Sequence, residues 1–122
     1  MKTLKNKLDI TLHKLFDMLL TIKMYHWKTS KFSAHKATDE LYETFNTNMD
    51  KFVEIWLGKN GKRVNGDINI SIKYSSNKKN LIKKIRTLIT HLDGLTVGPD
   101  LLSVKDDIVG DLNKFIYLLS FN

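Results

Sequence analysis

Near the start of the chain, apolar side chains recur with the period of an α-helix. They follow one another at alternating steps of four and three, with a histidine last: Leu8, Leu12, Leu15, Leu19, Ile22 and His26. This spacing places them on one face of a helix, which turns once in about 3.6 residues. The pattern predicts a helix from about Leu4 to Lys28, with His26 pointing into a bundle of helices.

Three later segments show the same period. We expect helices from about Ser33 to Leu57, from about Lys78 to Leu92 and from Pro99 onward. Ser33 is the candidate N-cap of the second helix, and Gly58 its candidate end signal. One proline and six glycines leave few other breaks in the chain.

The expected fold is all-α, a four-helix bundle formed as a single domain over residues 1–122. A long loop at residues 59–77, with an extended stretch at 68–74, joins its two helical hairpins. The chain has no cysteine, so packing alone must stabilise it. No apolar run reaches the length of a membrane span, and the start of the chain does not resemble a signal peptide, so we expect a cytoplasmic protein without a membrane partner.

The second predicted helix carries one histidine and three carboxylates beside its apolar face. On a helical wheel, Asp39, Asp50 and Glu54 lie within about 100° of His35. The neighbouring arc is apolar: Leu41, Phe45, Met49, Phe52 and Trp56. Carboxylates beside a core need partners, because desolvating an unpaired charge is costly. The stripe is therefore a candidate metal site, although a histidine four residues before an aspartate also occurs as an ordinary surface pair.

Axial distances decide which kind of metal site is feasible. At about 1.5 Å per residue, His35 lies about 22 Å from Asp50 and about 28 Å from Glu54 on the same helix. A second, antiparallel copy, related by a two-fold axis near residues 43–45, would place its carboxylates beside His35 and create two identical sites. His26, at the end of the first helix, can join the cluster. Such His and carboxylate ligands suit Fe, Mn or Zn.

A metal site within one chain is the competing geometry. Di-iron bundles take ligands from two helix pairs, including Glu-x-x-His motifs. The third and fourth helices provide only a few candidates: His91, Asp93, Asp106, Asp107 and Asp111. The chain contains no Glu-x-x-His. A centre shared between subunits therefore fits the sequence better.

The stretch from about residue 19 to residue 58 resembles the signature of the Dps-type mini-ferritins, the DNA-binding proteins from starved cells. The resemblance rests on these residues: His26, Trp27, Phe32, His35, Asp39, Asp50, Glu54 and Gly58. The three carboxylates follow His35 at four, fifteen and nineteen residues, the intervals of the family. The chain looks like a short, divergent member, of the kind encoded by phages and large viruses.

The resemblance implies a ferritin-like bundle with a di-iron centre at a two-fold interface. One subunit would supply His26 and His35, and its mate Asp50 and Glu54. Asp39 would be a further ligand or support one, and Trp27 would lie near the metal. The assembly would be at least a dimer, and in the family it is a cage of twelve subunits. The interval between the two histidines is shorter here than is usual in the family.

The expected function is oxidation of Fe(II), as a ferroxidase acting in iron sequestration or oxidative protection. The alternative is a non-catalytic ferritin-like protein, structural or binding DNA non-specifically, with a vestigial metal site. Lysine and arginine number 20 against 13 acidic residues, for a net charge of +7. The candidate nucleic-acid contacts are Lys2, Lys5, Lys7, Lys59, Lys62, Arg63, Lys78, Lys79, Lys83 and Lys84. Such binding would be sequence-independent and salt-sensitive, but the same residues also fit a solvated loop and helix face.

Overall fold

The computed structural model describes the backbone of residues 4–72 and 77–121, with side chains from residue 7 onward. Its helices are α1 (Leu4–Lys28), α2 (Phe32–Asn60), α3 (Lys78–Asp93) and α4 (Pro99–Leu119). No β-strand occurs in the described segments, so the predicted all-α four-helix bundle is confirmed. The stretch expected to be extended is irregular as far as residue 72, and its remainder lies outside the described residues.

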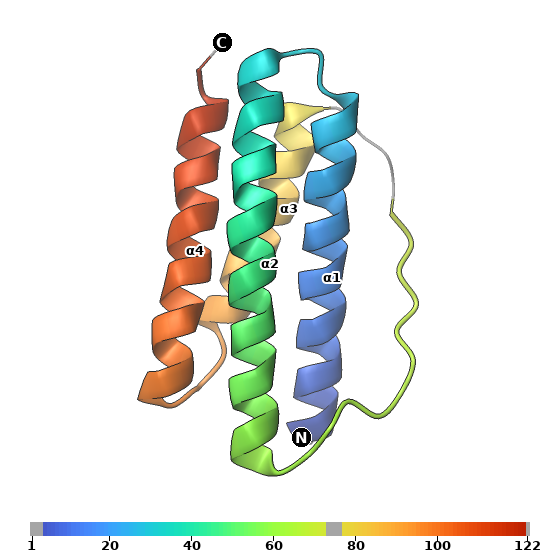
Figure 1. Ribbon diagram of the computed structural model, residues 1–122, viewed down its shortest axis with the longest axis vertical. Helices are drawn as coiled ribbons and strands as arrows, with labels where there is room; N and C mark the ends of the chain where they lie inside the picture. Colours follow the sequence, from blue (N-terminus) through green and yellow to red (C-terminus); the bar gives the residue numbers. More distant parts are fainter. Residues whose placement is uncertain (1–3, 73–76, 122) are drawn as a thin grey trace.

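The connection between α2 and α3 determines the arrangement of the bundle. Helices α1 and α2 form an antiparallel hairpin, whereas the connection after α2 returns along the molecule so that α3 starts beside the α1–α2 turn (Figure 1). Helix α2 packs against α1 and α4, and α3 packs against the other sides of α1 and α4. One long crossover of this kind is also the connectivity of ferritin-like bundles.

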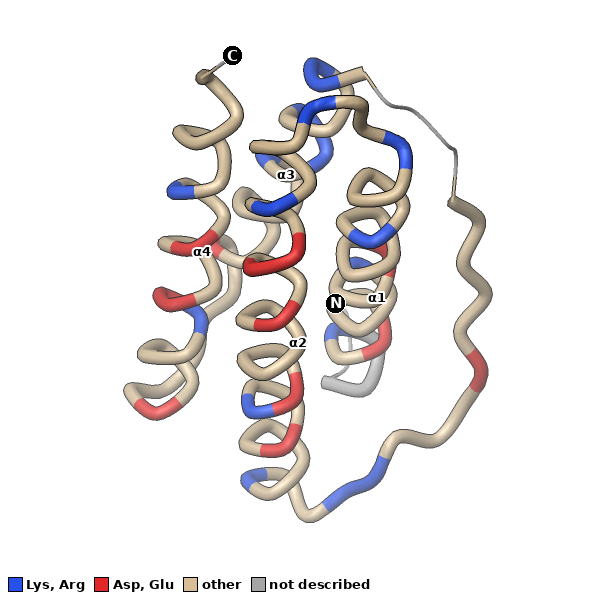
Figure 2. The backbone as a smooth tube through the Cα atoms, turned by 45° about the horizontal axis from the view of Figure 1, so that its top comes forward, with Lys and Arg blue, Asp and Glu red and all other residues tan. Residues whose placement is uncertain are grey.

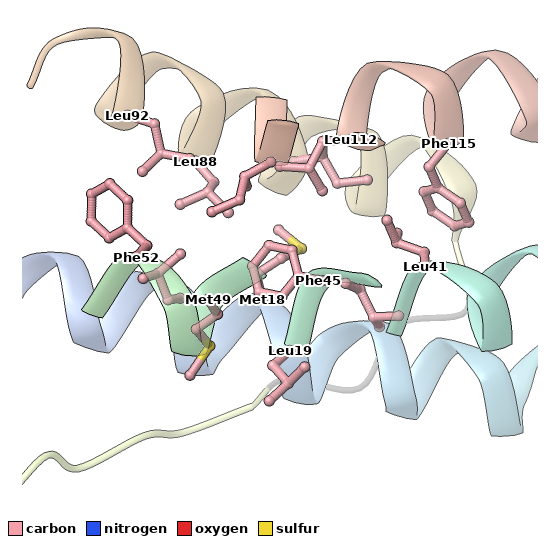
Figure 3. Packing of buried hydrophobic residues seen from close by; sticks show 14 of the residues in the cluster. Met18, Leu19, Leu41, Phe45, Met49, Phe52, Leu88, Leu92, Leu112 and Phe115 are labelled. Atoms are coloured by element: carbon pink, nitrogen blue, oxygen red, sulfur yellow. The ribbon is translucent and has the colours of Figure 1, made fainter. Parts of the chain in front are cut away.

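All four helices contribute to one apolar core (Figure 3). Phe45 and Phe52 of α2 project between the other helices and are almost completely buried. Met18 of α1 and Leu112 of α4 are equally buried. These residues belong to the periodic faces noted in the sequence, and burying each large apolar side chain contributes roughly 1.5–3 kcal/mol. The core therefore holds α1 and α2 side by side, where the two candidate histidines meet.

The two ends of α2 differ from the prediction. Helix α2 begins at Phe32, with Lys31 in the N-cap position and no side-chain cap, so Ser33 lies inside the first turn. At the other end the helix continues past Gly58 to Asn60. Gly61 ends it in a left-handed conformation (φ 59°), where its N–H bonds to helix carbonyls. Gly58 is thus an interior helix residue, and the end signal belongs to Gly61.

Two ion pairs link neighbouring helices in the described part of the chain. Lys84 of α3 lies 2.9 Å from Asp17 of α1, and Lys59 of α2 lies 2.9 Å from Asp100 of α4. The hydrogen bond from Lys59 holds the pKa of the Asp100 carboxyl below its ordinary value. Among these segments, no helix has both the length and the apolar composition needed to cross a bilayer.

Candidate metal centre

The α1–α2 turn brings His26 and His35 face to face. Their ring centroids are 3.7 Å apart and their planes differ by 19°. Nδ1 of His26 is 2.8 Å from the backbone oxygen of His35, and Nδ1 of His35 is 2.8 Å from the backbone oxygen of His26. The short interval between these histidines therefore joins them in a reciprocal pair of hydrogen bonds.

These hydrogen bonds define which ring nitrogen carries the proton in the neutral form of each histidine. A backbone carbonyl can only accept, so each Nδ1 must carry the proton that it donates. In the neutral imidazole Nε2 then keeps a lone pair, the form in which histidine binds a metal. A hydrogen bond from the second ring nitrogen to a carbonyl is the usual support of metal-binding histidines. In this tautomer, Nε2 is the ring nitrogen through which either side chain could act as a ligand.

Thr38 is a buried member of this cluster that the sequence patterns did not reveal. It is completely buried, and its Oγ1 lies 3.0 Å from Nδ1 of His26. The Thr38 hydroxyl donates toward the carbonyls of Ala34 and His35, so its oxygen can accept from the His26 ring. The available signal was its position one turn after His35, on the side of α2 that faces α1.

The three candidate carboxylates form part of a row of acidic residues along α2, visible in Figure 2. Asp39, Asp50 and Glu54 are exposed. Within the described segments, none of these three side chains makes a hydrogen bond or an ion pair. Their charges remain solvated in one subunit and can accept a cation.

One chain does not assemble a complete metal site. Among the described residues, no group of three or more His, Asp or Glu side chains lies close enough to hold an ion. His26 and His35 meet at one end of α2, whereas Asp50 and Glu54 lie toward the other end, about 22 and 28 Å from His35 along the axis. Asp39 is one helical turn beyond His35 but does not complete a cluster with the histidines.

The outer face formed by α1 and α2 exposes several large apolar side chains. Phe16 and Leu20 are each more than a third exposed, and Trp27, next to His26, is 66% exposed. The ammonium group of Lys23 lies 5.5 Å from the Trp27 ring centroid and 4.7 Å from that of Tyr42. Trp27 therefore lies on the face shared by the two helices, beside the histidine pair.

The same face is hollowed beside Asp50. A groove of about 570 Å³ runs there between α1, α2 and the connection that follows α2. Its lining is mostly apolar and includes Phe16, Met49, Val53 and Ile68. The exposed Trp27 thus lies at the histidine end of this face, and an apolar groove lies at its carboxylate end.

Helix α4 carries a second acidic group that has a different environment. Asp111 is partly buried, which raises the pKa of its carboxyl, and the charge of Asp107 raises the pKa further. Asn48 of α2 donates a hydrogen bond to Asp111 over 3.3 Å. This carboxylate therefore links α2 to α4 and does not form a cation site with the other aspartates of α4.

The fold divides the candidate nucleic-acid residues between the two ends of the molecule (Figure 2). Three of them follow each other at the end of α2 and in the loop after it: Lys59, Lys62 and Arg63. Three others belong to the first turns of α3, at the opposite end: Lys78, Lys79 and Lys83. Lys84 pairs with Asp17, and Lys7 is exposed near the start of α1. Lys2 and the side chain of Lys5 lie outside the described residues.

Comparison with known proteins shows which family includes this chain. A protein of Enterobacteria phage T4, described as an uncharacterized 14.6 kDa protein in the mobD-ri intergenic region, is 29% identical over 97 residues, which are 78% of this chain and 73% of the phage protein. A relative encoded by a phage agrees with the viral kind of protein expected from the sequence. No solved structure matches the chain. Residues 26–119, which contain all five candidate ligands, match the model of a family of unknown function, DUF5856. The chain therefore belongs to the DUF5856 family.

Proposed function

We propose that this protein oxidises Fe(II) at a di-metal centre shared across a two-fold dimer interface, in iron sequestration or oxidative protection. The observation that carries the proposal is the reciprocal His26–His35 pair, in which each Nδ1 donates to a backbone carbonyl and leaves Nε2 of the neutral ring as the possible metal ligand.

A second copy completes the site without any change in the fold. An antiparallel two-fold axis near residues 43–45 of α2 brings Asp50 and Glu54 of one protomer beside the histidines of its mate. The same axis brings Trp27 of each protomer to the level of the apolar groove beside the other's Asp50. One operation thus joins the ligands and covers an exposed aromatic side chain in an apolar groove.

The ligand chemistry suits iron, which is the substrate of the proposed reaction. Imidazole nitrogen binds Fe(II), and carboxylate oxygen favours the harder Fe(III). Two Fe(II) ions give one electron each to hydrogen peroxide, which takes up two protons and leaves as two water molecules. Each histidine offers one Nε2 nitrogen as a ligand, and Mn or Zn could bind the same ligands.

The test is oxidation of Fe(II) by the purified protein. Fe(II) is added without oxygen, hydrogen peroxide follows, and the absorbance of Fe(III) is recorded over time. Asp50→Ala combined with Glu54→Ala should reduce the protein-dependent rate at least about tenfold, because one side of each centre is removed.

A matched control removes the same charge from another face of the protein. Asp106→Ala combined with Asp107→Ala on α4 should leave the rate unchanged, because both residues are exposed and distant from the α1–α2 face. Equal rates in the two double variants and the natural protein would refute the proposal. They would favour the alternative, a bundle of this kind without catalytic activity.

A further inference from the structure

A separate hollow lies where the α1–α2 turn meets the start of α3 and the end of α4. Its volume is about 200 Å³. Three lysines from three different parts of the fold line it: Lys28 at the end of α1, Lys31 in the turn, and Lys78 at the start of α3. The Lys78 ammonium group donates to the carbonyl of Leu119 over 2.8 Å, which holds it beside the hollow.

Among the described residues, the lining of this hollow contains lysines but no aspartate or glutamate. Further lysines lie in the first turns of α2 and α3, at the same end of the bundle: Lys36, Lys79 and Lys83. Figure 2 shows basic residues around the α1–α2 turn and at the start of α3, at the end of the bundle where the acidic row of α2 begins. Charge of one sign around a concave surface concentrates ions of the opposite sign.

The other polar groups of the lining are hydroxyls. Thr29, Ser30 and Ser33 all contribute to the hollow. Lysine ammonium groups and short hydroxyl side chains are characteristic donors to phosphate oxygens. The concave, polar lining is less suitable for a membrane surface, which calls for an exposed apolar face with basic residues around it.

An exposed aromatic pair lies at the border of the hollow. Phe121 lines it and is 53% exposed. The Phe121 ring meets that of Tyr117, itself 63% exposed, edge-on at 5.0 Å between centroids. This contact supports the ring of Phe121 and leaves it available to an incoming planar group. Stacking of a base on an exposed aromatic ring is the usual way to bind single-stranded nucleic acid.

We propose that this hollow binds the phosphate of a nucleotide unit while its base stacks on Phe121. The unit is a residue of single-stranded DNA or RNA, or a free nucleotide, since both present the same phosphate and base. The hollow adjoins the His26–His35 pair through Tyr25 and Ala34, but its lining contains neither histidine, so the proposal does not depend on metal binding. It also differs from the set of candidate nucleic-acid contacts named from the sequence, because it uses one end of the bundle only.

Fluorescence anisotropy of a labelled single-stranded oligothymidylate, measured at low salt, tests the proposal. We expect binding that weakens steeply as salt increases. Lys28→Gln combined with Lys31→Gln should raise the Kd at least about fivefold. The slope of log Kd against the logarithm of the salt concentration should also decrease by about one for each phosphate that a lysine no longer neutralises. Phe121→Ala should raise the Kd by a similar factor, because base stacking is removed.

Lys51→Gln combined with Arg86→Gln is the matched control, since it removes the same charge from exposed positions that do not line the hollow. This control should bind like the natural protein. If thymidine monophosphate displaces the labelled oligomer, the site is assigned to free nucleotides. If only longer oligomers displace it, the site is assigned to nucleic acid. Either result supports the proposal. An equal loss in the control, unchanged binding by Phe121→Ala, or binding only to vesicles that contain anionic phospholipid would overturn it.

Discussion

The chemistry of the candidate centre depends on single hydrogen bonds at the α1–α2 turn. Nδ1 of His26 has two acceptors, the carbonyl of His35 and the hydroxyl oxygen of Thr38. Nδ1 of His35 has the carbonyl of His26. Because these bonds hold the rings in one orientation, we expect the residues that accept them to contribute to the affinity of the proposed metal site.

Replacing Thr38 by valine tests this dependence at one buried atom. Thr38→Val keeps the shape of the side chain but removes an acceptor for His26 and the hydroxyl's own bonds to helix carbonyls. We expect a loss of about 0.5–1.5 kcal/mol in the free energy of unfolding, measured in urea. The Zn(II) affinity of the purified protein, measured by titration, should fall about tenfold or more.

Thr87→Val is the corresponding control in α3. The Thr87 hydroxyl also bonds to a helix carbonyl, that of Lys83 at 3.0 Å, but it is exposed and lies away from the histidines. Its replacement should change Zn(II) affinity by less than twofold, which is roughly 0.4 kcal/mol. If both variants lose the same affinity, Thr38 has no specific role at the site.

Spacing in the sequence was sufficient to select the two histidines as candidate site residues, but it did not select Thr38. His26 continues the apolar repeat of the first helix, and His35 begins the stripe of carboxylates, so both stand out in a helical pattern. Threonine inside a helix usually bonds to a carbonyl one turn earlier, which gives no indication of another partner. The contact of Thr38 with His26 depends on how two helices pack, and that is a tertiary property.

At the scale of elements, the end of α2 shows how one turn of helix alters the connection that follows. Gly58 and Gly61 are both glycines after the apolar repeat, and both are plausible end signals. The side chain of Asn60 donates to the carbonyl of Trp56 over 2.8 Å, inside the additional turn. Of these two glycines, only Gly61 adopts a positive φ. The helix therefore ends there, and Lys59 is placed beside Asp100.

Alanine substitutions at the two glycines should have opposite effects. Gly61→Ala forces a side chain into the left-handed region and should destabilise the protein by about 1–2 kcal/mol. Gly58→Ala lies inside the helix, where the added methyl group meets nothing within 4 Å, and should stabilise it by about 0.5–1 kcal/mol. Urea unfolding of both variants measures the difference. Destabilisation by Gly58→Ala would mean that α2 ends near residue 58 in solution.

The four helices were predictable, whereas their exact ends were not. Apolar periodicity extends over many residues and is little affected by any single one, so α1 and α3 start and end close to the expected positions, and α4 starts at the expected Pro99. Helix ends depend on one or two residues that compete for the same role. Lys31 at the N-cap of α2 illustrates this, because Ser33 is the better capping residue by type.

For the whole molecule, the two proposed sites occupy neighbouring parts of the surface. The α1–α2 face combines exposed apolar groups with the histidine pair and the acidic row, whereas the lysine-lined hollow lies between the α1–α2 turn, the start of α3 and the end of α4. The arrangement of these surfaces depends on the crossover between α2 and α3, which brings the start of α3 to that end. The sequence placed Lys59, Lys62 and Arg63 in the same candidate nucleic-acid set as the lysines of residues 78–84, because it does not show that the fold puts them at opposite ends.

The dimer is the property on which the metal centre depends, and two leucines of similar exposure allow it to be tested. Leu20 on α1 is 39% exposed on the proposed interface, and Leu102 on α4 is 41% exposed on another face. In a dimer formed through α1 and α2, Leu20→Glu places a charge in a buried apolar contact, a change that costs several kcal/mol. Leu102→Glu leaves the charge in water.

Sedimentation velocity at micromolar concentration should therefore show a monomer for Leu20→Glu and an assembly of natural mass for Leu102→Glu. Peroxide-dependent Fe(II) oxidation should follow the same division, because a monomer keeps the histidines but loses the carboxylates of its mate. Circular dichroism should show the same helical content in both variants, so that misfolding does not account for the loss. A monomeric Leu20→Glu variant that oxidises Fe(II) at the natural rate would place the reaction inside a single chain. An assembly unaffected by Leu20→Glu would place the subunit contact on a different face.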